Sequence, residues 1–165
     1  MQSLHLRIII DESLYIKNPD STELGRQIVS KSILMIQEMG FEDFTFKKLG
    51  KEIGSPESSI YRYFENKHSL LIYLVSWYWA WMDYRLVFAM TNIPSPEERL
   101  KIAVNLLVKP IKEDLSISHI NEIALSQIII NESVKAYHTK NVDKENKKGH
   151  FKNYKDVVKR VSEII

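Results

Sequence analysis

Residues 40–71 read GFEDFTFKKLGKEIGSPESSIYRYFENKHSLL. Within this stretch, Thr45 can cap a short helix that stops at Gly54, because threonine is a favoured N-cap and glycine is favoured just after a helix end. The Ser-Pro-Glu sequence at 55–57 then supplies a cap, a first-turn proline and an acidic first turn for a second short helix. We therefore expect two short helices joined by a glycine-containing turn.

Longer helices are expected on both sides of this stretch. Apolar residues recur at helical intervals over residues 24–39, and Ser21 or Thr22 can cap that helix. On the other side, Asn66 can cap a helix that runs from Lys67 to about Met90, because nothing in that segment breaks it. The order is one long helix, two short helices and another long helix.

One long helix followed by two short ones is the plan of a helix-turn-helix module. In such a module the second short helix is held by its inner face, while its outer face reaches the major groove of DNA. Here Ile60 and Phe64 would form the inner face and pack on Leu49 and Ile53. This leaves five residues to meet DNA: Ser58, Ser59, Tyr61, Arg62 and Tyr63.

The same stretch resembles the signature of the TetR (tetracycline repressor) family of transcriptional regulators. In that family a Gly-Phe pair and a threonine precede a small helix, a glycine turn, a recognition helix ending Tyr-x-Tyr/His-Phe, and a lysine that opens the fourth helix. Each part has a match at the corresponding position here: Gly40, Phe41, Thr45, Leu49, Gly54, Ser59, Ile60, Tyr61, Tyr63, Phe64, Lys67 and Leu70.

The resemblance implies an all-α fold in which an N-terminal helix-turn-helix head joins a C-terminal helical bundle through a long fourth helix. We expect residues 1–20 to be an N-terminal extension, residues 21–66 the DNA-binding domain, and residues 67–165 the effector-binding and dimerisation domain. The family binds operator DNA as homodimers and is released or altered by small-molecule effectors. The resemblance therefore implies a transcriptional regulator, most simply a repressor, that binds a palindromic operator.

By resemblance, a threonine, two tyrosines and a lysine hold phosphates, and residues early in the recognition helix reach bases. Hydroxyl and ammonium groups are suitable phosphate donors, and free N–H groups at helix starts add positive potential. The expected DNA contacts are Thr45, Lys47, Glu57, Ser58, Ser59, Tyr61, Arg62, Tyr63 and Lys67. For both tyrosines a packing role is equally open, because tyrosine often buries its ring and exposes its hydroxyl.

The recognition region departs from the family pattern. Ser55, Pro56 and Ser58 stand where valine, serine and glycine are usual, so the helix cap can shift by one residue. Glu57 stands where a lysine or another polar group is more common; it would repel a phosphate but could accept from a cytosine amino group. These departures favour one alternative function, a helical ligand-carrying or protein-interaction module that has lost DNA binding.

Composition excludes several classes of protein. The chain has 165 residues, of which 44% are hydrophobic and 27% charged, as in ordinary globular proteins. The net charge of +2 does not by itself indicate nucleic-acid binding. The chain has no cysteine, which excludes disulfides and thiolate sites and is consistent with a reducing, cytoplasmic location. Residues 1–20 lack the pattern of a secretory signal.

The outer segments give weaker signals. Alternation of Leu4, Leu6, Ile8 and Ile10 predicts a short extended segment. A fully signalled helix start at Ser95 and Pro96 leads to a helix that Pro110 ends or kinks. A further helix is expected after Ser116 or Ser118, with these residues pointing inward: Ile120, Ile123, Ala124, Ile128 and Val134.

The lysine-rich residues 139–149 are predicted to be a loop, and a helical stripe resumes at Phe151. That stripe is still apolar at Ile165, the last residue. Because the family pairs through its two final helices, two interpretations stay open: one dimerisation helix is missing, or the chain is truncated.

An aromatic stripe marks the long helix: Tyr73, Trp77, Trp81, Tyr84 and Phe88. Such stripes are usually core, but the family encloses its effector beside this helix. The residues expected to line that pocket are therefore Trp77, Trp81, Tyr84 and Phe88. Asp83 and Arg85 interrupt the apolar run, which excludes a transmembrane helix here.

No enzymatic chemistry is indicated. The five histidines are scattered, and only Glu65 and His68 have a spacing used in carboxylate metal sites, which alone does not make a site. No glycine-rich phosphate loop or nucleophile–base constellation is present, so we expect neither a cofactor nor a bound metal.

Overall fold

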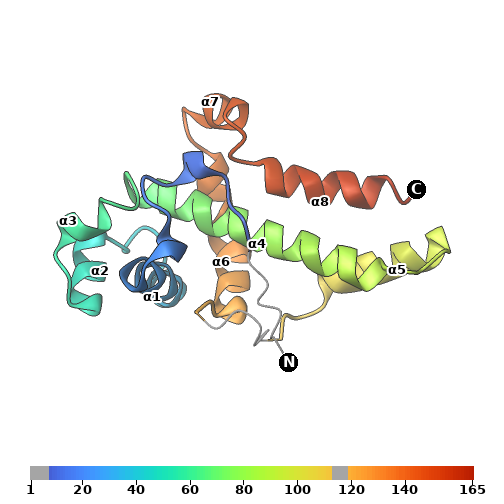
Figure 1. The fold of residues 1–165 in the computed structure, drawn as a ribbon, viewed down its shortest axis with the longest axis horizontal. Helices are drawn as coiled ribbons and strands as arrows, with labels where there is room; N and C mark the ends of the chain where they lie inside the picture. The colour runs from blue at the N-terminus through green and yellow to red at the C-terminus, as the bar shows by residue number, and fades with distance from the viewer. Residues whose placement is uncertain (1–7, 113–118) are drawn as a thin grey trace.

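The computed structural model describes residues 8–112 and 119–165, and all regular structure in these residues is helical. Three helices gather at one end of the molecule: α1 (Glu23–Met39), α2 (Phe46–Ile53) and α3 (Glu57–Ile60) (Figure 1). We call these three helices and the residues between them the head. The all-α class predicted from the sequence is confirmed.

Helix α4 (Lys67–Met90) starts at the head and runs along the length of the molecule (Figure 1). Every residue from Leu70 to Tyr78 is buried, because the head, α6 (Glu122–Tyr137) and the N-terminal segment surround this half of the helix. The other half lies between α5 (Pro96–Val108) and α8 (Lys152–Ser162) and forms a smaller core with them. Helix α4 thus connects the head to the C-terminal helices.

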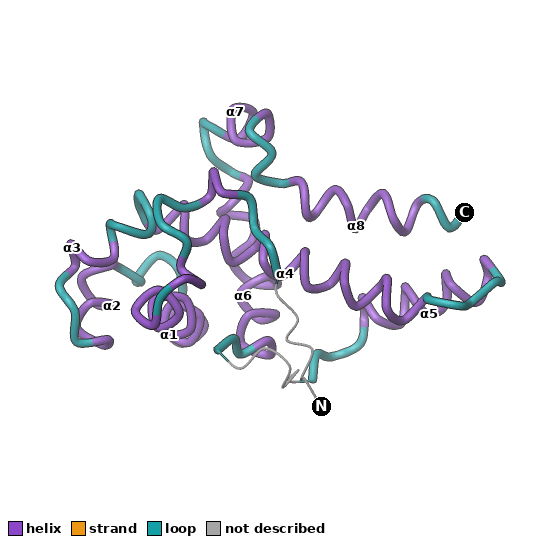
Figure 2. Tube along the Cα trace, in the orientation of Figure 1, coloured by secondary structure: helices purple, strands orange, loops and turns teal. Residues whose placement is uncertain are grey.

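The N-terminal segment, residues 8–22, folds back over the head and α4 (Figure 2). It contains two short 3-10 turns, η1 (Glu12–Leu14) and η2 (Pro19–Ser21), and η2 contacts α1. The predicted extended segment falls partly on residues 1–7, which lie outside the described residues. Residues 8–10 form neither strand nor helix, so no strand follows from the alternating pattern in the part that is described.

Several helix boundaries agree with the capping residues. Thr22, Thr45 and Asn66 each accept a hydrogen bond from a backbone N–H in the first turn of α1, α2 and α4. Ser95 does the same for α5, which ends before Pro110 as predicted. These caps satisfy N–H groups that the helix leaves unpaired, which is why they predict helix starts well.

The C-terminal part requires three corrections. Helix α6 begins at Glu122, capped by Asn121, and not directly after Ser116 or Ser118, which lie outside the described residues. Ile123 and Val134 were expected inside but are 41% and 55% exposed, because α6 packs on α1 and α4 through a face centred on Leu125 and Ile128. The predicted loop also contains a short helix, α7 (Val142–Lys147).

Candidate nucleic-acid interface

The turn between α2 and α3 depends on two glycines. Gly54 adopts a left-handed conformation with φ of 67°, which ends α2 at little steric cost. Gly50 lies under the turn, and a Cβ atom there would meet the carbonyl oxygen of Ser55 at 2.7 Å. Because Gly50 has no side chain, the backbone of the turn can pass close to α2, and α3 can pack against α2.

Helix α3 is a single turn that starts at Glu57 and ends at Ile60. Pro56 occupies the N-cap position and no side chain caps the helix, so the expectation of a Ser55 cap with Pro56 in the first turn is wrong by one residue. The one-residue shift considered from the sequence is what the structure has. Tyr61 to Tyr63 follow as a turn and extend the surface of the helix.

The inner face of this unit is confirmed. Ile60, Phe64 and Leu49 are fully buried, and Ile53 is half-buried at the edge of the same core. Phe46, also buried, contacts the ring of Tyr61 edge-on with 5.1 Å between ring centroids. Packing from several directions thus fixes the rotation of α3, which leaves its other side towards solvent.

We call the outward side the reading face. Among the residues expected to contact DNA, Glu57, Ser58 and Arg62 are exposed there and Ser59 is half-buried. Tyr61 is 45% exposed; its ring rests on Phe46 and its hydroxyl lies 3.4 Å from a Glu57 carboxylate oxygen. Thr45 and Lys47, at the start of α2, are exposed as well.

Tyr63 departs from the expectation. It is 3% exposed, and its hydroxyl lies 2.7 Å from Oγ1 of Thr22, with either atom able to donate. The carbonyl oxygen of Tyr63 accepts from the N–H of Ile16, and the Lys17 ammonium lies 5.3 Å from its ring centroid. The packing alternative therefore holds for Tyr63, because the N-terminal segment covers it.

Lys67 is also engaged within the protein. Its ammonium donates to the carbonyl oxygens of Phe41 at 2.8 Å, Glu42 at 3.1 Å and Phe44 at 3.0 Å. An ammonium has three protons, so these bonds use its full donor capacity. In this structure Lys67 therefore holds the linker between α1 and α2 and does not offer a proton to a phosphate.

Residues 28–74, from the middle of α1 to the second turn of α4, match the model of a protein family described as bacterial regulatory proteins, tetR family. This part of the chain is therefore similar to proteins of that family. The comparisons with curated proteins and with solved structures found no match. The matched residues contain the whole α2–α3 unit, and the head is that of a DNA-binding transcriptional regulator.

The four aromatic residues expected to line an effector pocket form two stacked pairs along α4. Trp77 and Trp81 are buried in the core and stack with 6.0 Å between ring centroids. Tyr84 and Phe88 stack on each other at 6.2 Å further along α4, where Phe88 is 73% exposed. Trp77 and Trp81 thus lie in the core, while Tyr84 and Phe88 lie nearer the surface, and a shared effector pocket at these four residues stays a prediction.

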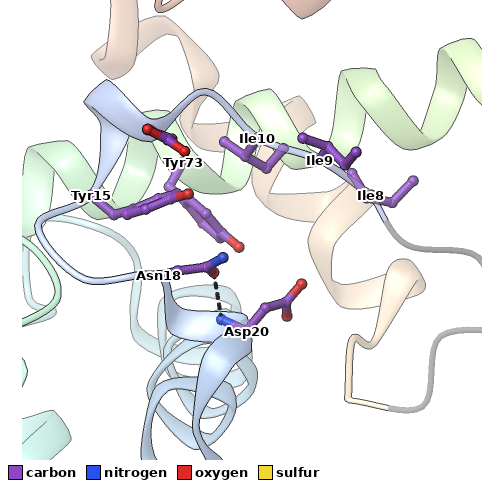
Figure 3. A pocket seen from close by; sticks show the side chains of 8 residues that line it. Ile8, Ile9, Ile10, Tyr15, Asn18, Asp20 and Tyr73 are labelled. Carbon is purple, nitrogen blue, oxygen red and sulfur yellow. Dashed lines mark hydrogen bonds between the residues drawn. The ribbon is translucent and has the colours of Figure 1, made fainter.

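A cavity of about 260 Å³ lies between the N-terminal segment and α4 (Figure 3). Its apolar wall is Ile8 to Ile10, and Tyr15 and Tyr73 face this wall with their rings in edge contact. Burial raises the pKa of Tyr73, which keeps its hydroxyl protonated. No pattern in the sequence indicates this cavity, because its walls come from segments far apart in the chain.

A second cavity, of about 310 Å³, is polar and lies between η1, the start of α4 and α7. Nε2 of His68 lies 2.9 Å from a Glu145 carboxylate oxygen at its edge. Burial lowers the pKa of His150, which also lines this cavity.

Within residues 8–112 and 119–165, no three histidine or acidic side chains are grouped so as to hold a metal ion. None of the helices described combines the length and apolar content needed to cross a membrane.

Proposed function

We propose that this protein is a transcriptional regulator of the tetR family, that it binds a palindromic operator as a homodimer, and that a small molecule changes its affinity for DNA. The observation that supports this most is the arrangement of α3. Ile60 and Phe64 hold its inner side in the core, while Glu57, Ser58 and Arg62 are presented to solvent. A rigidly held helix with an exposed polar side is what insertion into a major groove requires.

The proposed DNA contacts lie on the reading face and at the start of α2. Ser58 and Ser59 would reach base edges, Glu57 could accept from a cytosine amino group, and Arg62 and Lys47 would neutralise phosphates. Thr45 and Tyr61 add hydroxyl groups and, at Thr45, the N-terminal end of α2. Tyr63 and Lys67 are left out because the side chains of both are engaged in contacts within the protein.

We propose a division into a head of residues 21–66 and a C-terminal domain of residues 67–165. Residues 8–20 act with the head, because Ile16 and Lys17 contact Tyr63. On the C-terminal helices, Phe88 and Val108 expose most of their apolar surface, and a second copy of the chain could cover such surface in a dimer. Repression and action in the cytoplasm are the simplest consequences of binding an operator in a bacterium.

For the effector, the cavity behind Ile8 to Ile10 is the better candidate than the aromatic stripe. It is largely apolar on one side, it carries tyrosine and asparagine groups on the other, and Tyr73 of α4 forms part of its wall (Figure 3). Tyr73 also contacts Phe64 with 5.4 Å between ring centroids. A molecule in this cavity would therefore touch a residue that packs directly on the end of the recognition unit.

The alternative function is a non-enzymatic ligand carrier or interaction module that no longer binds DNA. One observation favours it: Glu57, at the start of α3, places a carboxylate on the reading face, where DNA phosphates would repel it.

In vitro selection from a random duplex library separates the two functions. A regulator enriches one sequence made of two inverted half-sites about one helical turn apart, and the complex contains two chains. Failure of the folded protein to enrich any sequence at low salt would support the carrier.

A further inference from the structure

The backbone of Phe41 is held from both sides by charged side chains of other helices. Its carbonyl oxygen accepts from the ammonium of Lys67, the first residue of α4, at 2.8 Å. Its N–H donates to Oε1 of Glu132, in α6, at 3.2 Å. The N–H and the carbonyl oxygen of Phe41, in the linker between α1 and α2, are therefore both hydrogen-bonded to side chains of helices outside the head.

The Glu132 side chain is well placed for this role. It is only 12% exposed, and its second oxygen lies 2.6 Å from the ammonium of Lys135, one turn further along α6. Lys135 also reaches Glu42 at 3.5 Å. The hydrogen bond with Glu132 raises the pKa of Lys135, so this lysine keeps its positive charge. A hydrogen bond to an ionised acceptor is stronger than one between neutral groups.

The linker between α1 and α2 is short, so a displacement of the linker also moves the start of α2. Phe41 is separated from Thr45, the N-cap of α2, by three residues that include the fully buried Phe44. Lys67 also binds the carbonyl oxygen of Phe44, so the linker has little freedom to absorb a displacement. A shift of α6 relative to α4 would pull the two bonds of Phe41 in different directions and move the start of α2.

We propose that Glu132 is a positioning residue for DNA binding, which sets the orientation of the head through the Phe41 N–H. This role rests on the proposed function. Glu132 does not touch DNA; it keeps α2 and α3 at the angle that the operator requires. The same hydrogen bond connects α6 directly to the head. A ligand that displaces α6 would therefore reorient the reading face through Glu132.

The test compares Glu132→Ala, which removes the acceptor, with Glu132→Gln, which keeps a neutral acceptor. The control is Glu97→Ala, which removes an exposed carboxylate on α5. Three quantities are measured on each full chain: affinity for the selected operator, amide hydrogen exchange at Phe41, and exchange at the buried Leu49 of the head.

We expect Glu132→Ala to weaken operator binding by about ten-fold, a typical size for coupling between sites, and to speed exchange at Phe41. Leu49 should exchange as in the wild type, because the core of the head does not include Glu132. Glu132→Gln should recover most of the affinity, and Glu97→Ala should resemble the wild type.

Unchanged affinity in Glu132→Ala, with exchange at Phe41 accelerated, would overturn the positioning role. Faster exchange at Leu49 in Glu132→Ala would mean that the head itself is destabilised, which would also overturn the positioning role. The role would survive that result only if Glu132→Gln lost part of the operator affinity while Leu49 exchanged as in the wild type. If the wild type binds no duplex, the proposed function fails instead, and the exchange rate at Phe41 still reports whether Glu132 holds the linker.

Discussion

The hydroxyl of Tyr63 lies 2.7 Å from Oγ1 of Thr22, the residue that caps α1. This bond joins the turn after the recognition helix to the start of the first helix, and the N-terminal segment covers it. It explains why two tyrosines only two positions apart have different surroundings: Tyr63 closes the head, while Tyr61 shows its hydroxyl on the reading face.

The two tyrosines should respond differently to loss of their hydroxyl groups. Tyr63→Phe should lower the free energy of unfolding by about 1 kcal/mol, because it removes a buried hydrogen bond. Tyr61→Phe should leave that free energy nearly unchanged and weaken operator binding. Chemical denaturation measures the stability and fluorescence anisotropy measures the operator affinity. If Tyr63→Phe weakened operator binding and Tyr61→Phe lowered the stability, Tyr63 would be the residue that faces DNA.

Replacement of Lys67 should act on stability first. Lys67→Met keeps much of the side-chain length but leaves three carbonyl oxygens without their donor, and we expect a loss of about 1–3 kcal/mol in unfolding free energy. The dependence of DNA affinity on salt should stay as in the wild type, because no phosphate contact is lost. A shallower salt dependence with unchanged stability would mean that Lys67 leaves the linker to bind a phosphate.

Local signals and tertiary contacts explain what could and could not be predicted from the sequence. Thr22, Thr45 and Asn66 cap their own helices, so the starts of α1, α2 and α4 followed from neighbouring residues alone. The burial of Tyr63 could not follow in this way, because it depends on a segment more than forty positions away in the chain.

The donors and acceptors of the linker were missed for the same reason. Lys67 looks like any lysine at a helix start until the three carbonyl oxygens of the linker are placed around it. Glu132 had no signal at all, since a glutamate on an amphipathic helix is ordinary. On α6, the inward face was misjudged at Ile123 and Val134 because packing on two helices decides which apolar residues are covered.

The aromatic stripe of α4 should divide into a structural half and a surface half. Trp81→Ala should cost about 3–5 kcal/mol in unfolding free energy, since Trp81 is fully buried. Phe88→Ser should change the stability of a single chain by no more than about 0.5 kcal/mol. Thermal unfolding at several protein concentrations tests both, and a large loss at Phe88 that depends on concentration would place Phe88 in the dimer contact.

His150 should make the protein less stable in mild acid. Burial lowers its pKa below the ordinary value of 6.5, so near that pH the unfolded chain binds more protons at this residue than the folded one. Its contribution is therefore present above pH 6.5 and lost as the pH falls towards the lowered pKa.

His150→Gln should flatten the fall in unfolding free energy between about pH 7 and about pH 5, the window in which a histidine titrates. His138→Gln, at an exposed position, serves as the control and should keep the wild-type slope. Equal slopes for the wild type and His150→Gln would show that His150 is protonated as easily in the folded protein as in the unfolded chain.

Binding to the selected operator as a function of salt concentration tests the role of the reading face most directly. Wild-type affinity should fall linearly on logarithmic axes. Arg62→Met and Lys47→Met each remove one phosphate contact from both chains of the dimer, so each should reduce that slope by about 1.8 without changing the unfolding midpoint. A folded protein that does not bind duplex DNA at low salt, or a slope that neither substitution changes, would contradict the assignment of this face to DNA.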